Sequence, residues 1–178
     1  YKLHVRGFSM DAKPSTTNGT FQAVSARIPY LQGIGVTTVE LMPVYEFEER
    51  IFPEEKMLPD YIQWEAEDAD MIVPPEETKV LPKLNFWGYT KGNYFAVKSS
   101  YARNATKASQ EYKALIRKLH QHGMECVMEF FFPEGTDQNL ILAALRFWVM
   151  EYHVDGFHLL GENLPMTAIV QDKRLSRT

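Results

Sequence analysis

The stretch E-C-V-M-E-F-F-F-P, residues 125–133, does most to decide the fold class. It is an almost continuous apolar run closed by a proline, which is typical of a short strand buried on both faces. The runs 1–8, 36–44 and 154–161 have a similar strand character, so the sequence predicts four strands. In the last of them, the alternation of side chains places His158, Leu160 and Glu162 on one side.

Helical patterns lie between these strands. An apolar stripe at helical spacing precedes the second strand, a second stripe precedes the third, and a third precedes the fourth. Ser109 is the predicted N-cap of the middle helix, and Glu111 favours its first turn. The stripes consist of Phe21, Val24, Ile28 and Leu31; of Tyr112, Leu115, Ile116 and Leu119; and of Leu140, Ala144, Phe147 and Trp148.

Buried strands that alternate with helices predict parallel β/α units. Four such units are half of an eightfold barrel, whose usual length is roughly 250 residues. The sequence therefore predicts an α/β fold in which residues 1–178 form one partial (β/α)8 barrel, a piece of a longer chain. Its first and fourth strands would have open edges that a partner or a second copy could cover, so self-association is expected.

Residues 46–82 interrupt this pattern after the second strand. They are acidic, contain several prolines and show no sustained periodicity, which predicts a long insertion loop. A solvated surface is the simplest interpretation, and partner binding is the alternative.

Composition restricts the function. The net charge of −4 gives no electrostatic basis for binding nucleic acid, and no apolar run approaches the roughly 20 residues that cross a bilayer. The single cysteine, Cys126, excludes an internal disulfide and favours a reducing, cytoplasmic location. The sequence has no metal-binding or phosphate-binding motif, so neither a metal nor a cofactor is expected.

Several motifs occur in a recognisable order. They are Y-K-L-H-V-R-G-F (1–8), G-T-F-Q-A (19–23), I-P-Y-L-Q-G-I-G-V-T-T-V-E-L-M-P-V (28–44), N-F-W-G-Y (85–89), E-Y-K-A-L-I-R-K-L-H (111–120) and F-W-V-M-E-Y-H-V-D-G-F (147–157). Together they resemble the α-amylase superfamily of glycoside hydrolases, and its pullulanase, isoamylase and glycogen-debranching branch in particular. The resemblance implies a (β/α)8 barrel and chemistry at α-glucosidic bonds.

The same resemblance implies that the catalytic positions are degenerate. The family uses a carboxylate nucleophile and a carboxylic acid, roughly 5 Å apart. Its nucleophile motif is similar to G-F-R-F-D, whereas residues 156–160 read G-F-H-L-L, so Leu160 stands for the aspartate and His158 for the arginine. In the third strand, Glu129 stands at the family's aspartate position, while Pro133 and Glu134 replace an asparagine and a histidine. We expect His158 and Glu129 to face the barrel interior, where they could form a hydrogen-bonded pair.

The motif N-F-W-G-Y is retained. By resemblance, Tyr89 is the tyrosine that stacks on a sugar, with Trp87 and Asn85 in supporting positions. Flat aromatic faces suit the apolar face of a glucose ring, and packing of the loop onto the barrel is the alternative role.

Three hypotheses follow. The parent protein could be an active hydrolase with relocated carboxylates, for which Glu162 is a weak substitute nucleophile and otherwise a solvated carboxylate. The chain could instead be an inactive domain that binds an α-glucan or maltooligosaccharide. It could also serve as a scaffold for assembly. We predict that the chain has no hydrolytic activity by itself, because leucine offers no lone pair to attack the anomeric carbon.

Overall fold

The computed structural model describes residues 1–11, 13–51 and 82–177. The chain separates into two compact units, Tyr1–Glu48 with Trp87–Thr178, and Glu49–Phe86. Most of the predicted insertion at 46–82 lies outside the described residues. Its described ends are β4 (Arg50–Ile51) and β5 (Lys83–Leu84), which pair antiparallel within the second unit.

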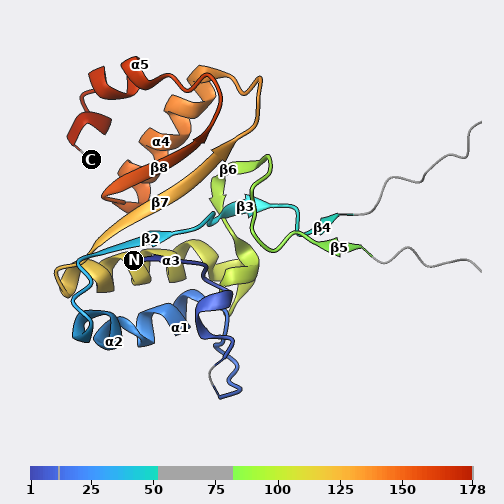
Figure 1. Ribbon diagram of the computed structural model, residues 1–178, viewed down its shortest axis with the longest axis vertical. Coiled ribbons are helices and arrows are strands. Elements are labelled where there is room, and N and C mark those ends of the chain that lie inside the picture. The colour runs from blue at the N-terminus through green and yellow to red at the C-terminus, as the bar shows by residue number, and fades with distance from the viewer. Residues whose placement is uncertain (12, 52–81, 178) are drawn as a thin grey trace, which may run out of the picture. The chain divides into compact units, whose positions relative to one another are not determined.

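The first unit is built on a parallel sheet in the order β1 (Lys2–Leu3), β2 (Thr38–Leu41), β7 (Glu125–Phe132) and β8 (Gly156–Gly161). The strands lie side by side in chain order, as Figure 1 shows. The predicted series of parallel β/α units is confirmed. The bounds of β7 match the predicted run, and β8 begins two residues later than predicted.

Two strands are shorter than predicted. The first ends at Leu3, where the chain turns into the 3-10 helix η1 (Gly7–Ser9), and the amide of Phe8 donates to the carbonyl of His4 at 2.9 Å. The second predicted strand stops at Leu41, because Pro43 cannot donate an amide to the parallel ladder. The chain then leaves the sheet as β3 (Tyr45–Phe47), which pairs antiparallel with β6 (Gly92–Val97).

The predicted helices are present with revised ends. The first is divided at Arg27 into α1 (Phe21–Ala26) and α2 (Ile28–Gly33), since Pro29 favours the start of a new helix. Ser109 is not a cap: α3 (Ala108–Gln121) begins one residue earlier, and the Ser109 hydroxyl contacts the Tyr152 hydroxyl at 3.0 Å. Glu111 lies in the first turn as expected. The remaining helices of the described residues are η4 (Ser99–Tyr101), η5 (Ala105–Lys107), α4 (Gln138–Tyr152), α5 (Met166–Gln171) and η6 (Leu175–Arg177).

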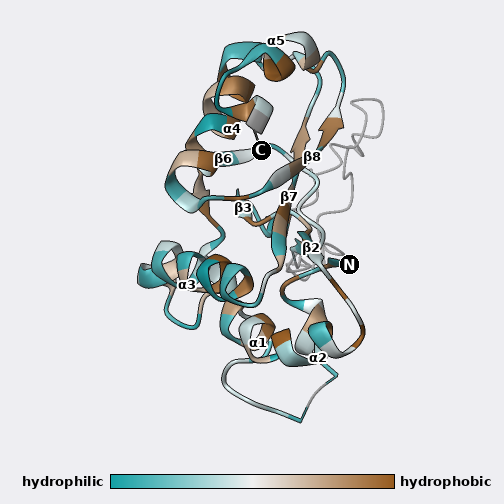
Figure 2. Cartoon of the chain, turned by 90° about the vertical axis from the view of Figure 1, so that its left-hand side faces the viewer, coloured by the Kyte–Doolittle hydropathy of each residue, from teal (hydrophilic) through white to brown (hydrophobic). Residues whose placement is uncertain are grey.

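An aromatic core joins the sheet to the helices. Phe130 of β7 is wholly buried and stacks on Tyr45 with 5.3 Å between ring centroids and an angle of 7° between ring planes. On the same face, Phe130 meets Trp148 of α4 at 5.9 Å, and Met128 accepts from Tyr112 of α3. The brown colouring along β7 in Figure 2 marks this hydrophobic strand. The face of β7 that carries Met128 and Phe130 therefore packs against helices, and the alternate residues face the other way.

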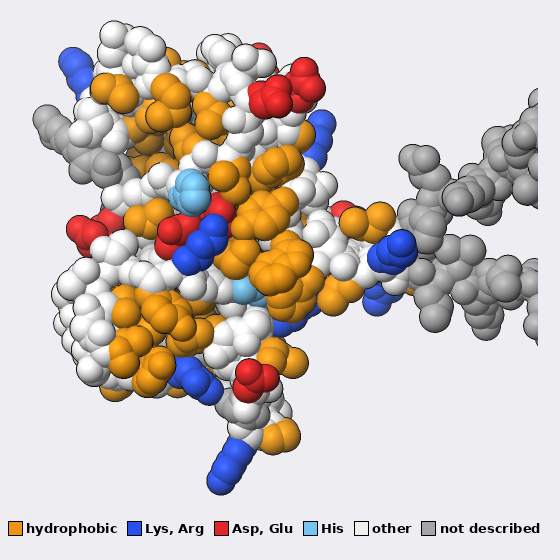
Figure 3. Space-filling view, in the orientation of Figure 1, with side chains coloured by type: hydrophobic (Ala, Val, Ile, Leu, Met, Phe, Trp, Pro, Cys, Tyr) orange, Lys and Arg blue, Asp and Glu red, His pale blue; other side chains and the backbone are white. Residues whose placement is uncertain are grey.

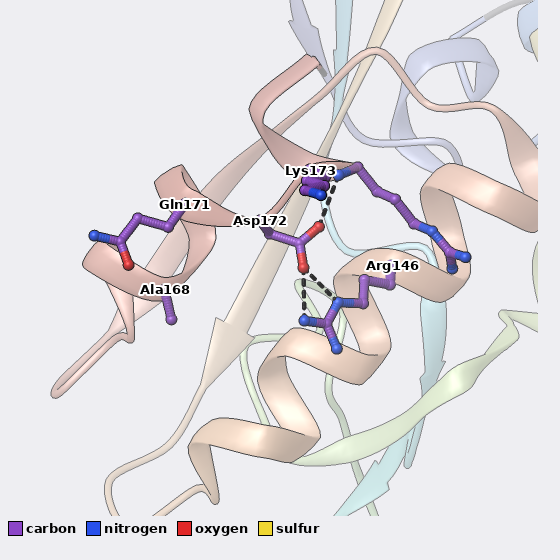
Figure 4. Close-up of a pocket in the computed structure, with 6 residues that line it drawn as sticks. Arg146, Ala168, Gln171, Asp172 and Lys173 are labelled. Carbon is purple, nitrogen blue, oxygen red and sulfur yellow. Dashed lines mark hydrogen bonds and ion pairs between the residues drawn. The ribbon is translucent and has the colours of Figure 1, made fainter.

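No pattern in the sequence predicted α5. Asp172, directly after α5, turns toward Arg146 of α4, and Figure 4 shows the contact, with 2.6 Å between Asp172 Oδ2 and Arg146 Nη2. Asp172 also accepts the amides of Arg174 and Leu175 at 2.9 and 3.1 Å. These bonds fix the start of η6 and bring Leu175 into the core.

Candidate functional site

A cluster of four ionisable residues occupies the face of the sheet that points away from the helices. We call Lys2, Glu40, Glu129 and His158 the inner cluster. The register of the sheet assembles it, since Lys2 pairs with Glu40 across β1 and β2, and Glu129 pairs with His158 across β7 and β8. Each residue comes from a different one of the four neighbouring strands, so the backbone ladder fixes their spacing.

Glu129 is the centre of the inner cluster. Its side chain is 0% exposed, and the Lys2 ammonium donates to Oε1 at 2.7 Å. Its other oxygen, Oε2, accepts from the Tyr89 hydroxyl at 3.1 Å. This buried carboxylate is therefore neutralised by a lysine and held at both oxygens, as a buried charge requires.

Glu40 and His158 complete the inner cluster. The Nδ1 atom of His158 lies 2.7 Å from Glu40 Oε1 and 3.7 Å from Glu129 Oε1, and the Lys2 ammonium lies 3.4 Å from Glu40 Oε1. Figure 3 shows acidic, basic and histidine side chains meeting in the middle of this face, with hydrophobic side chains around them.

The charges of the inner cluster shift the pKa values of Lys2, Glu40 and the neighbouring Tyr89. Burial opposes the change, but the hydrogen bond to Glu129 and its charge raise the pKa of the Lys2 ammonium above its ordinary value. Burial likewise acts against the ionised form of Glu40, yet the bond with His158 and the charge of Lys2 hold the pKa of that carboxyl below its usual range. Burial and then the charge of Glu129 raise the pKa of Tyr89. Lys2 and Glu40 are therefore held in their charged forms.

The expected partnership of His158 and Glu129 needs correction. The two residues do share the inner face, but the shorter contact of His158 is with Glu40, because Lys2 already occupies Glu129. Lys2 and Glu40 were missed in the sequence. A signal existed, since Glu40 is a lone charge inside the apolar run at 36–44.

The side chain of Tyr45 anchors the loop that carries Tyr89. The buried Tyr45 hydroxyl is within hydrogen-bond reach of the carbonyls of Gly88 and Thr90, at 3.1 and 3.0 Å. Gly88 has φ of +78°, and a Cβ there would lie 2.4 Å from the Phe47 ring, so only glycine fits. Tyr89 is consequently held in place on a backbone that is fixed on both sides.

Trp87 and Tyr89, on either side of Gly88, are both accessible. Trp87 is 54% exposed and Tyr89 is 37% exposed, while the Trp87 ring meets His4 edge-on at 5.7 Å between centroids. The two rings thus combine exposure with anchoring. Asn85 belongs to the second unit, where its amide donates to the Glu49 carbonyl at 2.8 Å, and its supporting role stays a prediction.

Leu160, Glu162 and Glu134 lie in or just after β8 and β7. Leu160 lies in β8, half-buried, opposite Phe131 of β7. Glu162 lies beyond the end of β8 and is exposed, in keeping with a solvated carboxylate, so it does not continue the alternation with His158 and Leu160 along the strand. Glu134, after β7, is exposed as well.

The inner cluster and the aromatic pair suit different chemistry. The aromatic pair, Trp87 and Tyr89, offers apolar ring surface with a polar tip, whereas the inner cluster offers two carboxylate groups, an imidazole and an ammonium.

Within the described ranges, no helix has the length and apolar character that a membrane span requires.

Comparison with known proteins identifies the fold. A sequence model of the family described as "Alpha amylase, catalytic domain" matches residues 6–141, which is more than half of the chain. The chain is 28% identical to isoamylase 3, chloroplastic, of Oryza sativa subsp. japonica, with 88% of this chain and 24% of the relative covered. It is 29% identical to the isoamylase of Pseudomonas amyloderamosa, with 77% of this chain and 15% of that protein covered.

The solved structures agree on the fold. A pullulanase from Paenibacillus barengoltzii, in complex with maltohexaose and alpha-cyclodextrin, superposes with a TM-score of 0.62 at 22% identity. The match covers 89% of this chain and 30% of the pullulanase. The parallel sheet therefore corresponds to part of a pullulanase-like barrel. The chain spans about a quarter or less of the length of these curated relatives.

Proposed function

The chain belongs to the family of alpha-amylase catalytic domains, and from that premise we propose that it binds α-glucans without hydrolysing them. The observation that carries the proposal is Leu160. It is part of β8, at the position that the family resemblance assigns to the nucleophilic aspartate, and its side chain has no atom that can attack an anomeric carbon. A retaining glycosidase requires such a nucleophile.

The aromatic pair supports the binding part of the proposal. Tyr89 is both exposed and held by its hydroxyl on Glu129, so little side-chain freedom is lost when a sugar stacks on its ring. Trp87 adds a second exposed ring from the same loop. The relatives point to the ligand class, since the pullulanase structure named above holds maltohexaose and alpha-cyclodextrin.

Calorimetric titration with linear and α-1,6-branched maltooligosaccharides tests the proposal. We expect binding that Tyr89→Ala abolishes. Tyr89→Phe removes only the hydroxyl and should keep most of the affinity. The matched control is Tyr30→Ala, because Tyr30 is a tyrosine on α2 with 55% exposure. No heat with any glucan at millimolar concentration, or equal losses in Tyr89→Ala and Tyr30→Ala, would overturn the binding proposal.

Hydrolysis by relocated carboxylates is the second candidate, and one distance favours it. A carboxylate oxygen of Glu40 and one of Glu129 lie within 4.8 Å of each other, close to the separation of roughly 5 Å in retaining enzymes. However, the Glu129 side chain is 0% exposed and its two oxygens are bonded to Lys2 and Tyr89, so in this arrangement it is poorly placed to act as a nucleophile or a general base. We expect no reducing ends from pullulan or maltohexaose. Release of products that stops in Glu40→Gln would establish the hydrolytic alternative.

Assembly is a separate candidate. Among the described strands, β1 and β8 border the sheet and each has a partner on one side only. We include self-association through these edges in the proposal, together with a reducing, cytoplasmic location, which the buried free thiol of Cys126 favours. Light scattering after size-exclusion chromatography measures the oligomeric state, and a monomer at high concentration would remove self-association.

A further inference from the structure

We propose that His4 is a positioning residue that holds the Trp87 ring in place for an α-glucan. The inference deepens the proposed glucan-binding function and rests on it, because it concerns the same aromatic pair. His4 follows β1 directly, and Trp87 lies in the loop before β6, so the contact between them joins two separate parts of the chain.

The His4 ring is buried and bonded at both nitrogens. His4 is 7% exposed, and the amide of Gly7 donates to its Nδ1 atom at 3.1 Å. Because a backbone amide can only donate, Nδ1 carries no proton and Nε2 carries it. The Nε2 atom therefore donates to the Tyr101 hydroxyl oxygen, which lies 3.1 Å away. These two bonds, on different sides of the ring, fix the orientation of its plane.

The two partners of the His4 ring are themselves held in the fold. Gly7 begins η1, and Tyr101 ends η4 and is 1% exposed. The Tyr101 ring packs edge-on against Phe21 of α1, with 6.1 Å between ring centroids, and against Phe47 of β3, with 6.4 Å. The orientation of His4 therefore follows from the packing of the aromatic core.

The contact with Trp87 links this fixed ring to the glucan site. The centroids of the His4 and Trp87 rings lie 5.7 Å apart and their planes meet at 83°, which is a favourable arrangement of aromatic rings. Trp87 is 54% exposed, so a sugar can reach its ring while His4 contacts it. A ring that is already held loses less freedom when a ligand stacks on it, and this favours binding.

The two rings of the aromatic pair are thus held by different side chains. The hydroxyl of Tyr89 donates to Glu129, whereas Trp87 meets His4. Gly88 stands between them with φ of +78° and no room for a Cβ, so the backbone between the rings is fixed as well. The pair is therefore a preformed surface for a sugar, and His4 fixes the Trp87 half of it.

Two substitutions at His4 separate this role from a purely structural one, because His4 also accepts from the turn at Gly7. His4→Asn keeps an acceptor for the Gly7 amide but has no ring, whereas His4→Phe keeps a ring and loses both hydrogen bonds. We expect His4→Asn to weaken glucan binding by about two- to tenfold, which corresponds to one edge-on ring pair. His4→Phe should weaken binding less. A role confined to the turn would give the opposite order.

Calorimetric titration of the full chain with maltohexaose measures these affinities, and circular dichroism confirms that each variant is folded. The matched control is His122→Asn. His122 is a half-buried histidine after α3, and its Nδ1 atom also has a backbone partner, the Lys118 carbonyl at 2.8 Å. The control should bind maltohexaose like the unchanged protein.

Fluorine NMR of the chain labelled with 5-fluorotryptophan gives a second readout, which needs no glucan. Single substitutions by phenylalanine assign the resonances of Trp87 and Trp148. His4→Asn should shift the Trp87 resonance and leave that of the wholly buried Trp148 in place. Tyr101→Phe keeps the ring and removes only the hydroxyl that orients His4, so it should also shift the Trp87 resonance. It replaces His4→Asn if that variant is not folded.

The outcomes distinguish this inference from the glucan function. A Trp87 resonance that stays in place in the folded variants, or an unchanged affinity of His4→Asn for maltohexaose, would overturn the role of His4 alone. An equal loss of affinity in His122→Asn would do the same. If the unchanged protein gave no heat with maltohexaose, the glucan function would fail and this inference would fail with it.

Discussion

Lys2→Met should destabilise the protein by removing the only ammonium that contacts the buried carboxylate of Glu129 in the described part of the chain. Breaking a fully buried ion pair costs about 3–5 kcal/mol, whereas an exposed pair contributes at most about 1 kcal/mol. Here Glu129 is 0% exposed and Lys2 is 39% exposed, so the case is intermediate. We expect the free energy of unfolding to fall by about 2 kcal/mol, which corresponds to about 4–8 °C in melting temperature.

Urea unfolding at pH 7 with a double-mutant cycle measures this effect. Glu129→Gln removes the buried charge, so the double variant should lose about 1–2 kcal/mol less than the sum of the two single variants. Lys13→Met is the matched control, since Lys13 is exposed, and its change should stay within about 0.5 kcal/mol. If Lys2→Met changed the stability no more than this control, the ammonium would not be what neutralises Glu129.

Three other measurements follow from the structure. The pKa of Glu40 is lower in the folded state than its ordinary value of 4.5. The ionised carboxylate therefore stabilises the folded protein above that value, and this contribution is lost as the pH falls through the folded pKa. Acid unfolding monitored by circular dichroism should accordingly be less steep in Glu40→Gln. Gly88→Ala should lower the free energy of unfolding by about 2–5 kcal/mol, because the new methyl group would lie 2.4 Å from the Phe47 ring. The control is Gly35→Ala, where φ is also positive but the space is open, and it should lower the free energy of unfolding by about 1–2 kcal/mol in the same urea experiment. Burial raises the pKa of the Cys126 thiol, so alkylation at pH 8 should proceed only as fast as the protein unfolds, and rapid labelling under native conditions would contradict this burial.

The sequence was most informative where a single hydrophobic pattern extended over a whole helix or strand. The apolar run at 125–132 predicted β7 with its observed bounds, and the helical stripe after Tyr112 predicted α3. The strand predicted from 1 to 8 was too long because alternation continues in the residues that form the turn after Leu3. Alternation records which residues are buried and does not record where the partner strand stops.

The candidate site could be predicted only in part, for a related reason. The family resemblance pointed to His158, Glu129 and Tyr89, and these three residues do meet the same inner cluster. Lys2 lies 127 residues from Glu129 and could be placed only once the order and register of the strands were known. The choice of Glu40 as the partner of His158 depends in turn on Lys2, so it was out of reach of any local pattern.

The long sequence separations in the inner cluster have a consequence for folding kinetics. The bond from Lys2 to Glu129 and the bond between His158 and Glu40 span 127 and 118 residues, so both close only after the four strands have assembled. We expect such contacts to form after the transition state of folding. Their loss should leave the refolding rate almost unchanged and accelerate unfolding. We therefore expect the inner cluster to slow the unfolding of the assembled sheet and to contribute little to its folding rate.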